Sequence, residues 1–383
     1  MNIVYIAPSI IPSASANSVH IMKMCEAFAQ NNVSVKLLVP STTNNLGLGG
    51  EYEFYGVCNN FKIIRNKFVT NAPVGIWNYI FAFSSILYAI YTKSDVIFTR
   101  NPIVSFFCII FRKRHILEMH DEMRSVSFKL FKLFKLFKLF KLFKLFKSKM
   151  ILKFIVISKP LKGLYLKEFD IEPNKVLVLP DGVNYEQFIK INVKKPLQNE
   201  VVGIGYIGSL YKGRGIDVIL NLAKNIPSCK FKIYGGSPEE ASLVKTHIDK
   251  KNIKNIFIHQ HIPNKEVPEK LCEQDILLMP YQRKVQERGG GDTAKWMSPM
   301  KMFEYMASGR VIVSSDLPVI REVLNENNSY LVDPENIQEW INVIKEIINN
   351  KDMAIDKADK AKEDVLQYTW HDRAKQIIRS IDV

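Results

Sequence analysis

A glycine-rich, basic turn is the first segment whose residue types suit ligand chemistry. It reads YIGSLYKGRGID from Tyr206 and contains Gly208, Lys212, Gly213 and Arg214. Glycine lets a backbone approach an anion closely, a following helix offers free N–H groups, and arginine can hold two phosphate oxygens at once. The pattern favours a phosphate site, although glycine turns in α/β folds also simply connect strands to helices.

A second segment joins a glycine loop to a helix. Residues 289–309 read GGGDTAKWMSPMKMFEYMASG, with Asp292 in the loop and Lys301 and Glu304 near the start of a predicted helix. The apolar residues of this helix recur at helical spacing, which predicts that one face packs inward.

A histidine at a strand end is the third candidate. His120 follows a predicted strand at 115–118 and precedes Asp121 and Glu122. From the residue types alone, a core histidine satisfied by its neighbours is the simpler explanation, and Glu118 is interpreted as structural. The place of His120 after a strand keeps open the alternative, a histidine that contacts a ligand.

Strand and helix patterns alternate through most of the chain, and these elements must position the three segments. Short β-branched or apolar runs predict strands at 3–7, 33–39, 96–99, 115–118, 154–157, 176–179, 202–207, 231–234, 256–258 and 276–279. Such alternation is typical of parallel sheets with helices on both faces. The polar stretch 191–200 separates two series, so we expect Rossmann-like domains over 1–192 and 193–367. An amphipathic helix over 368–383 is expected to pack back on the first domain.

Composition limits the classes of function. The 383 residues exceed what one core usually serves, and 47% hydrophobic with 24% charged residues is typical of packed domains. A formal net charge of +15 suggests a polyanionic partner, namely a phosphate-bearing ligand, an anionic membrane or nucleic acid. Five scattered cysteines without metal-ligand spacing and an N-terminus without a basic leader predict a reduced, cytoplasmic protein with no metal site.

Two segments raise the question of a membrane. Val74 to Tyr91 is eighteen residues long without a charge, the length at which a span must be considered. A weak polar stripe at helical spacing, and the strand that follows, favour a buried or interfacial helix over a span.

The other segment, Phe128–Lys147, repeats Lys-Leu-Phe with lysine at every third position. This period matches neither a strand nor an α-helix, so the lysine row winds around a helix and leaves no dry face. An interfacial helix on an anionic membrane accommodates the pattern best, and a repeat expansion without a function is the alternative. Without the seven lysines of the repeat the formal charge falls from +15 to +8, which argues against nucleic acid as a partner.

The helix segment belongs to a longer string that closely resembles the donor-site signature of glycosyltransferase family 4. From Ser298 the string reads SPMKMFEYMASGRVIVSSDLPVIREVL, and further landmarks in family order are YIGSLYKGRGID, FIHQHIP, DILLMPY, FIVISKPLKGLY, LPDGVN and LEMHDE. The resemblance extends along nearly the whole chain. It implies the GT-B architecture, in which two Rossmann-like, doubly wound domains face a central cleft, the first binding the acceptor and the second the nucleotide-sugar.

The resemblance also implies roles for single residues. Arg214 takes the place of the lysine that grips the donor diphosphate, and Glu304 that of the second glutamate of the E-x7-E motif, which holds the ribose. His120 falls on the histidine beside the anomeric carbon, and Ile262 on the loop that reads the base. The rest of the implied diphosphate loop is Gly208, Lys212 and Gly213.

Some positions depart from the family pattern. Trp296 stands where the first glutamate of E-x7-E is expected, and Ser209 where an arginine is expected. Asp292 could reach the donor sugar in place of the missing glutamate, or it is an ordinary loop aspartate. Lys301 could add positive charge near the diphosphate, or it is a solvated lysine at a helix start.

The implied activity is a retaining, hexosyltransferase-type transfer from a UDP- or GDP-sugar to a lipid-linked or growing surface glycan. The nucleotide-sugar is a substrate, so no cofactor and no metal are expected, and positive charge on the diphosphate leaving group would supply the rate. The repeat would hold the enzyme at the inner face of the plasma membrane. The alternatives are a GT-B nucleotide-sugar epimerase and a non-catalytic basic protein that binds a membrane.

Overall fold

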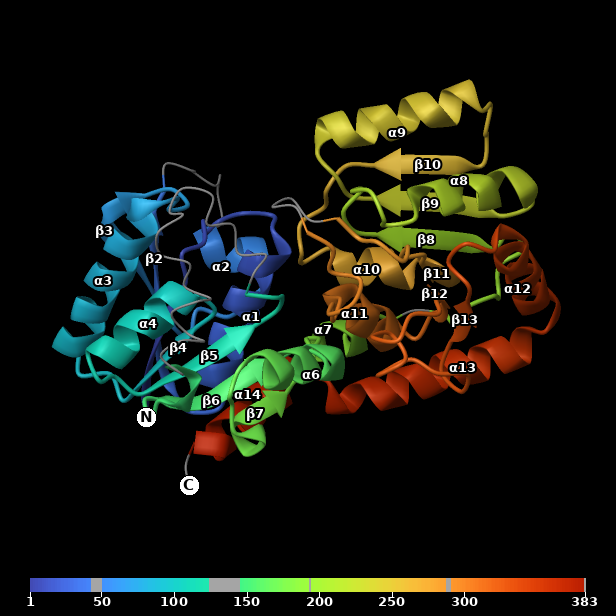
Figure 1. Cartoon of the computed structure of the whole chain (residues 1–383). Helices are drawn as coiled ribbons and strands as arrows, with labels where there is room; N and C mark the ends of the chain where they lie inside the picture. Colours follow the sequence, from blue (N-terminus) through green and yellow to red (C-terminus); the bar gives the residue numbers. More distant parts are fainter. Residues whose placement is uncertain (43–49, 124–144, 193, 287–290, 382–383) are drawn as a thin grey trace. The chain divides into compact units, whose positions relative to one another are not determined.

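The computed structural model describes residues 1–42, 50–123, 145–192, 194–286 and 291–381, which form two compact units (Figure 1). One unit comprises Met1–Asp181 with Trp370–Val383, and the other comprises Gly182–Thr369. This boundary precedes the expected one at 192/193, because Val183 and Phe188 are buried in a hydrophobic cluster of the second unit. The described part of the polar stretch that suggested a linker is a loop within that unit.

A parallel, seven-stranded sheet forms the first unit, in the order β3-β2-β1-β4-β5-β6-β7. The strands are β1 (Asn2–Ile6), β2 (Ser34–Ser41), β3 (Lys62–Thr70), β4 (Val96–Thr99), β5 (His115–Met119), β6 (Ile151–Val156) and β7 (Val176–Val178). The helical elements are α1 (Ala16–Gln30), α2 (Gly50–Tyr55), α3 (Ile76–Tyr91), α4 (Pro102–Ile110), η1 (Leu145–Lys147), α6 (Lys159–Glu168), η2 (Pro173–Lys175) and α14 (Trp370–Ile381). Because the chain begins in mid-sheet and winds outward on both sides, β1 and β4 form a topological switch point.

The second unit repeats this plan with six parallel strands in the order β10-β9-β8-β11-β12-β13. The strands are β8 (Gly203–Ile207), β9 (Lys230–Tyr234), β10 (Ile256–His259), β11 (Ile276–Met279), β12 (Val311–Ser315) and β13 (Tyr330–Val332). The helical elements are α7 (Glu186–Ile189), α8 (Ile216–Asn225), α9 (Pro238–Lys250), α10 (Val267–Cys272), α11 (Met300–Ser308), α12 (Ile337–Asn349), α13 (Lys351–Asp364) and η3 (Val365–Gln367). This is the Rossmann strand order, with the switch point between β8 and β11.

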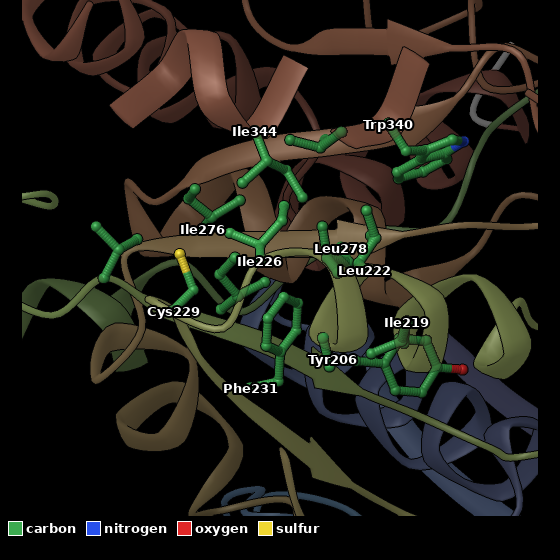
Figure 2. Packing of buried hydrophobic residues seen from close by; sticks show 14 of the residues in the cluster. Tyr206, Ile219, Leu222, Ile226, Cys229, Phe231, Ile276, Leu278, Trp340 and Ile344 are labelled. Atoms are coloured by element: carbon green, nitrogen blue, oxygen red, sulfur yellow. The ribbon is translucent and has the colours of Figure 1, made fainter. Parts of the chain in front are cut away.

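Two buried hydrophobic clusters form the core of the second unit, and Figure 2 shows one of them, between the sheet and helices that cover it. Tyr206 and Phe231 from the sheet, Ile219 from α8 and Ile344 from α12 contribute to one buried cluster. Trp340 of α12 is fully buried, and its Nε1 donates to Asp333 O at 3.0 Å, so the ring is buried without leaving its N–H unsatisfied.

The strands expected from the sequence are all present, and three further strands were not expected. β3 carries charges at Lys62, Arg65 and Lys67, which an edge strand tolerates but which hide its apolar pattern. β12 follows α11 after only two residues, and β13 has three residues. Short strands and short connections leave little pattern to detect.

The last helix, α14, belongs to the first unit and packs against α1. Trp370, Arg373, Ala374 and Ile377 form its buried face, and the apolar residues Ile378 and Ile381 are half-buried. The two ends of the chain are therefore part of the same unit.

Within the described residues, no helix is both long and apolar enough to cross a bilayer. The uncharged stretch from Val74 contains α3, which has sixteen residues. The predicted repeat helix over Phe128–Lys147 lies outside the described residues as far as position 144. At its end, Phe146 is buried and Lys147 Nζ lies 2.6 Å from Asp170 Oδ2.

Candidate functional site

The candidate residues of the second unit gather where β8 and β11 end. Gly208 directly follows β8, and Tyr281 lies two residues after β11. These paired strands form the switch point, where open α/β sheets bind ligands. Two basic side chains reach this point, Arg214 from the turn before α8 and Lys301 from the first turn of α11.

The Lys301 amine is buried at the switch point. Its Nζ lies 3.9 Å from the ring centroid of Tyr206 and 5.5 Å from that of Tyr281. A Cβ at Gly208 would stand only 2.3 Å from Nζ, so the absence of a side chain there lets the amine approach the backbone. Nζ has no hydrogen-bond partner among the described residues. Burial, with Arg214 nearby, lowers the pKa of Lys301 well below its ordinary value.

Arg214 approaches the same tyrosine ring. Its Nη1 donates to Tyr281 Oη at 3.1 Å, and the guanidinium carbon lies 5.2 Å from the ring centroid. Burial raises the pKa of Tyr281, so the phenol is neutral at pH 7. Two basic side chains therefore share one neutral ring, an arrangement that suits an anion with several oxygens.

The other residues predicted for the donor site have varied surroundings. Glu304 lies three residues after Lys301 on α11, on the same side of the helix. Gly213 is needed for packing, because a Cβ there would stand 2.1 Å from Lys284 O. The Lys212 side chain is exposed.

Asp292 accepts backbone hydrogen bonds in the loop before α11. Its Oδ1 accepts from Val285 N at 2.9 Å and from Ala294 N at 3.1 Å, so one carboxylate oxygen holds the turn together. Trp296, at the position of the missing glutamate, is half-buried a few residues later. Ile262 is half-buried in the loop after β10, against a hydrophobic cluster of the second unit.

A buried carboxylate organises the carboxyl end of the first sheet. Glu118 of β5 is wholly buried. Its Oε1 accepts from His120 Nε2 and lies 3.1 Å from His20 Nε2, while Oε2 accepts from Arg373 Nη1 at 3.2 Å. Arg100 Nε stands 3.9 Å from Oε1. Side chains from α1, α14 and the ends of β4 and β5 thus meet at one carboxylate.

These contacts shift the pKa values of Glu118 and His120. Burial by itself raises the pKa of Glu118, but Arg373, His20 and His120 together hold that pKa well below its ordinary value. Burial, aided by Arg100, lowers the pKa of His120 to about 4, so this histidine is neutral at pH 7. Because neutral His120 donates from Nε2, its Nδ1 is left as an acceptor.

One group in this centre has the ligand atoms that a metal ion could use. His20, His120 and Asp181 each offer an atom, and these atoms lie within 4.8 Å of one another. Burial raises the pKa of Asp181 to about 7, and the guanidinium groups of Arg100 and Arg373 are close by. Neighbouring positive charge disfavours a cation, so these surroundings argue against a metal centre.

The sequence did not point to several members of these centres. Arg100 directly follows β4, and Asp181 follows β7, so both had the same signal as His120, a polar residue at a strand end. His20 and Arg373 are buried polar residues on helices, which only tertiary contacts reveal. Tyr281 had no signal beyond its place after an apolar strand.

Comparison with known proteins agrees with this architecture. The model described as "Glycosyltransferase Family 4" matches residues 18–187, and the model described as "Glycosyl transferases group 1" matches residues 202–350. A poly(ribitol-phosphate) alpha-N-acetylglucosaminyltransferase of Staphylococcus aureus is 25% identical over 220 residues, which are 56% of this chain. The chain spans 40% of the length of that relative.

Solved structures share the fold over the full length. Sucrose-phosphate synthase from Thermosynechococcus elongatus has a TM-score of 0.72 at 14% identity and covers 99% of this chain and 98% of its own. Anabaena Alr3699/HepE, solved in complex with UDP-glucose, has a TM-score of 0.72 at 12% identity. The match covers 100% of this chain and 99% of that chain. With its two parallel sheets and its matched halves, the chain belongs to the family 4 glycosyltransferases of the GT-B fold.

Proposed function

We propose that this glycosyltransferase moves a hexose, with retention, from a UDP- or GDP-linked donor to a lipid-linked or growing surface glycan. One observation carries the proposal. Arg214 and the buried amine of Lys301 both lie near the Tyr281 ring, at the switch point of the second unit. A diphosphate supplies the anionic oxygens that both groups need. The Staphylococcus aureus relative, named for transfer to poly(ribitol-phosphate), supports a surface glycan as acceptor.

In this proposal the second unit holds the donor. Arg214 and Lys301 hold the diphosphate, with Gly208, Lys212 and Gly213 in the adjoining loop, and their positive charge stabilises the leaving group. Glu304 accepts from the ribose hydroxyls. The loop at Ile262 receives the base, and Asp292 approaches the sugar with the oxygen not used in its turn.

The first unit holds the acceptor and contributes His120. Because Nε2–H donates to Glu118, neutral His120 offers Nδ1 as an acceptor to a hydroxyl of the reacting sugar. No described carboxylate is proposed as a nucleophile and no metal is proposed, so the departing diphosphate leaves on the same face that the acceptor attacks.

Calorimetry with UDP and GDP, together with hydrolysis of a panel of nucleotide-sugars, tests this function. Arg214→Ala and Glu304→Ala should each weaken nucleotide binding by about tenfold or more, since a hydrogen bond to a charged group contributes about 1.5–3 kcal/mol. His120→Ala should mainly lower kcat. Lys250→Ala, at an exposed end of α9, is the matched control. Failure of UDP, GDP and all nucleotide-sugars to bind would overturn the proposal, and an epimerised product would reassign the reaction.

We also propose that Phe128–Lys147 holds the enzyme against the anionic inner face of the plasma membrane, where a lipid-linked acceptor lies. The seven lysines of the repeat support this, because each contributes up to about 1 kcal/mol near an anionic surface. Co-sedimentation of the full chain with anionic and neutral vesicles should show binding that weakens with salt and falls when most repeats are deleted. Equal sedimentation of the two proteins would identify the repeat as a passive expansion.

A further inference from the structure

The outer face of α3 in the first unit is apolar, and none of the described residues covers it. Phe81, Ala82, Ile86 and Ala89 form the buried side of the helix. On the opposite side, the exposed fraction is 53% for Trp77, 44% for Leu87 and 84% for Tyr91.

Leu87 and Tyr91 belong to a continuous stripe on this side, and Trp77 lies beside it. Positions 76, 80, 83, 87 and 91 follow one another at intervals of three or four residues, and each is Ile, Phe, Leu or Tyr. In an α-helix that spacing places side chains one above the other on one side. The helix has no charged residue in its sixteen positions. A surface helix of a soluble protein normally carries polar residues on this side, so the stripe is a patch to be explained.

The neighbouring helix α4 widens the patch. The Phe83 ring lies 6.0 Å from Phe107 and 5.8 Å from Phe111, measured between centroids, and Ile110 is exposed beside them. α3 and α4 pack against each other, as Figure 1 shows. Eight of the fifteen exposed large apolar residues among the described residues fall between positions 68 and 110, so the exposure is concentrated rather than scattered.

Basic residues flank the patch at one end. α3 and α4 each lead from one parallel strand to the next, so they run in the same direction and their last turns lie at the same edge of the sheet. Lys93 follows α3, and the run Arg112, Lys113 and Arg114 follows α4. From position 54 to position 117 the sequence has eight basic residues and one acidic residue, Asp95, whose carboxylate accepts from the backbone N–H of Asn2.

We propose that the outer face of α3 and α4 docks on an anionic lipid surface, with the aromatic and aliphatic stripe at the headgroup boundary and Lys93 and Arg112–Arg114 on the headgroups. Aromatic residues with a cationic margin are the composition of interfacial helices, and the deficit of acidic residues removes the repulsion that an anionic leaflet would otherwise meet. This docking surface is formed by other residues than the Lys-Leu-Phe repeat and the proposed donor site.

Trp77 makes the docking directly measurable in the unaltered full chain. Vesicles of phosphatidylcholine with phosphatidylglycerol, some carrying brominated acyl chains, are titrated into the protein while tryptophan emission is recorded. Emission from Trp77 should shift to shorter wavelength and be quenched by the brominated lipid, and Trp77→Phe should remove that response. Trp340 and Trp370 are buried and provide a constant background. An absence of quenching at vesicle concentrations that co-sediment the protein would overturn the proposal.

Matched variants then separate this surface from the repeat. Phe83→Ser with Leu87→Ser, and separately Arg112→Gln with Arg114→Gln, should each lower affinity for anionic vesicles by about tenfold or more, since a basic residue near such a surface contributes up to about fivefold. Leu243→Ser with Phe257→Ser, at exposed apolar positions of the second unit, should change nothing. The same losses should appear when the repeat is deleted, and unchanged affinity of both variants in that background would overturn the proposal.

Two further measurements control for misfolding of the variants and for self-association through this face. UDP binding reports the second unit and the Tm reports the whole chain. Both should be unchanged in Trp77→Phe and in the three double variants, so a loss of either would signal misfolding rather than lost docking. Sedimentation velocity without lipid should show the same association state for wild type and variants. A self-association that the Phe83 and Leu87 substitutions abolish, without an effect on vesicle binding, would assign the face to a second copy of the chain instead.

Discussion

The charged centres of the two units differ in how their charge is balanced. In the first unit, the Glu118 carboxylate has a hydrogen bond or close charge contact with His20, His120 and Arg373. In the second unit, the Lys301 amine is buried beside Arg214 and two aromatic rings, with no hydrogen-bond partner among the described residues. The Glu118 carboxylate is therefore paired without a ligand, although His20 and Arg100 beside it keep ring or guanidinium nitrogens without a hydrogen-bond partner among the described residues. The Lys301 amine has no such pairing, and a bound anion would supply it.

This difference predicts opposite consequences for stability. A buried charge that is fully paired is costly to disturb, because removing one partner leaves the other uncompensated. A buried amine without a partner already lowers the stability of the free protein, and that cost is recovered when an anion binds. Substitutions in the first centre should therefore destabilise the folded protein. Loss of the amine in the second centre should stabilise the free protein and weaken its binding of an anion.

Arg373→Ala is the strongest test of the first centre. Besides its contact with Glu118, Arg373 donates from Nε to Pro180 O at 2.9 Å and from Nη2 to Leu179 O at 3.2 Å, which fastens α14 to the end of β7. Breaking a buried ion pair costs about 3–5 kcal/mol. We expect a loss of this size in the free energy of unfolding from denaturant titration. Arg379→Ala, at an exposed position of the same helix, should change it by less than about 0.5 kcal/mol.

Lys301→Met tests the second centre with the opposite sign. Methionine keeps most of the volume and removes the amine, so the Tm of the free protein should stay the same or rise. Affinity for UDP should fall by about tenfold or more, because a charge-assisted contact is lost. Thermal unfolding and calorimetry on the same preparation measure both effects. A lower Tm with unchanged UDP affinity would show that the amine is a structural element of the core.

The sequence predicted the two parallel sheets better than the side-chain contacts around Glu118 and Lys301. Alternating apolar runs indicated both parallel sheets, and the glycine turn and the helix with Lys301 and Glu304 were found from local patterns. Lys301 was considered as a phosphate ligand or a solvated lysine, and no local pattern shows that its amine is buried against Gly208. The partners of Glu118 lie up to 255 residues away along the chain, so no local spacing could indicate them.

The Glu118 centre should also respond to acid. For His20 and His120, burial puts the folded-state pKa below the ordinary value, to about 4 for His120. Between pH 6.5 and 4 the unfolded chain therefore binds protons that the folded chain does not, and stability falls with pH. Asp181 acts in the opposite direction, because its folded-state pKa of about 7 favours the folded chain as pH drops.

The two histidines of this centre, together with His115, whose pKa burial also lowers to about 4, outweigh one aspartate, so the Tm should decline from pH 7 to pH 4.5. Asp181→Asn removes the opposing contribution and should make this decline steeper, whereas His120→Asn should make it shallower. Scanning calorimetry across this range in buffers of constant ionic strength measures all three profiles. A decline that neither substitution alters would place the acid-sensitive groups outside the Glu118 centre.

Asp292 offers the smallest effect and decides whether the second centre extends toward the donor sugar. Its Oδ1 holds the turn through Val285 N and Ala294 N, so Asp292→Ala should cost about 1 kcal/mol of stability whatever its role in the reaction. Asp292→Asn keeps an acceptor oxygen for the turn but replaces the second carboxylate oxygen with an amide. If that oxygen accepts from a sugar hydroxyl, the Asn variant should keep its Tm and its affinity for UDP while kcat/KM for the nucleotide-sugar falls by about tenfold. Equal kcat/KM for wild type and the Asn variant would limit the role of Asp292 to the turn, and the donor centre would then end at Arg214, Lys301 and Glu304.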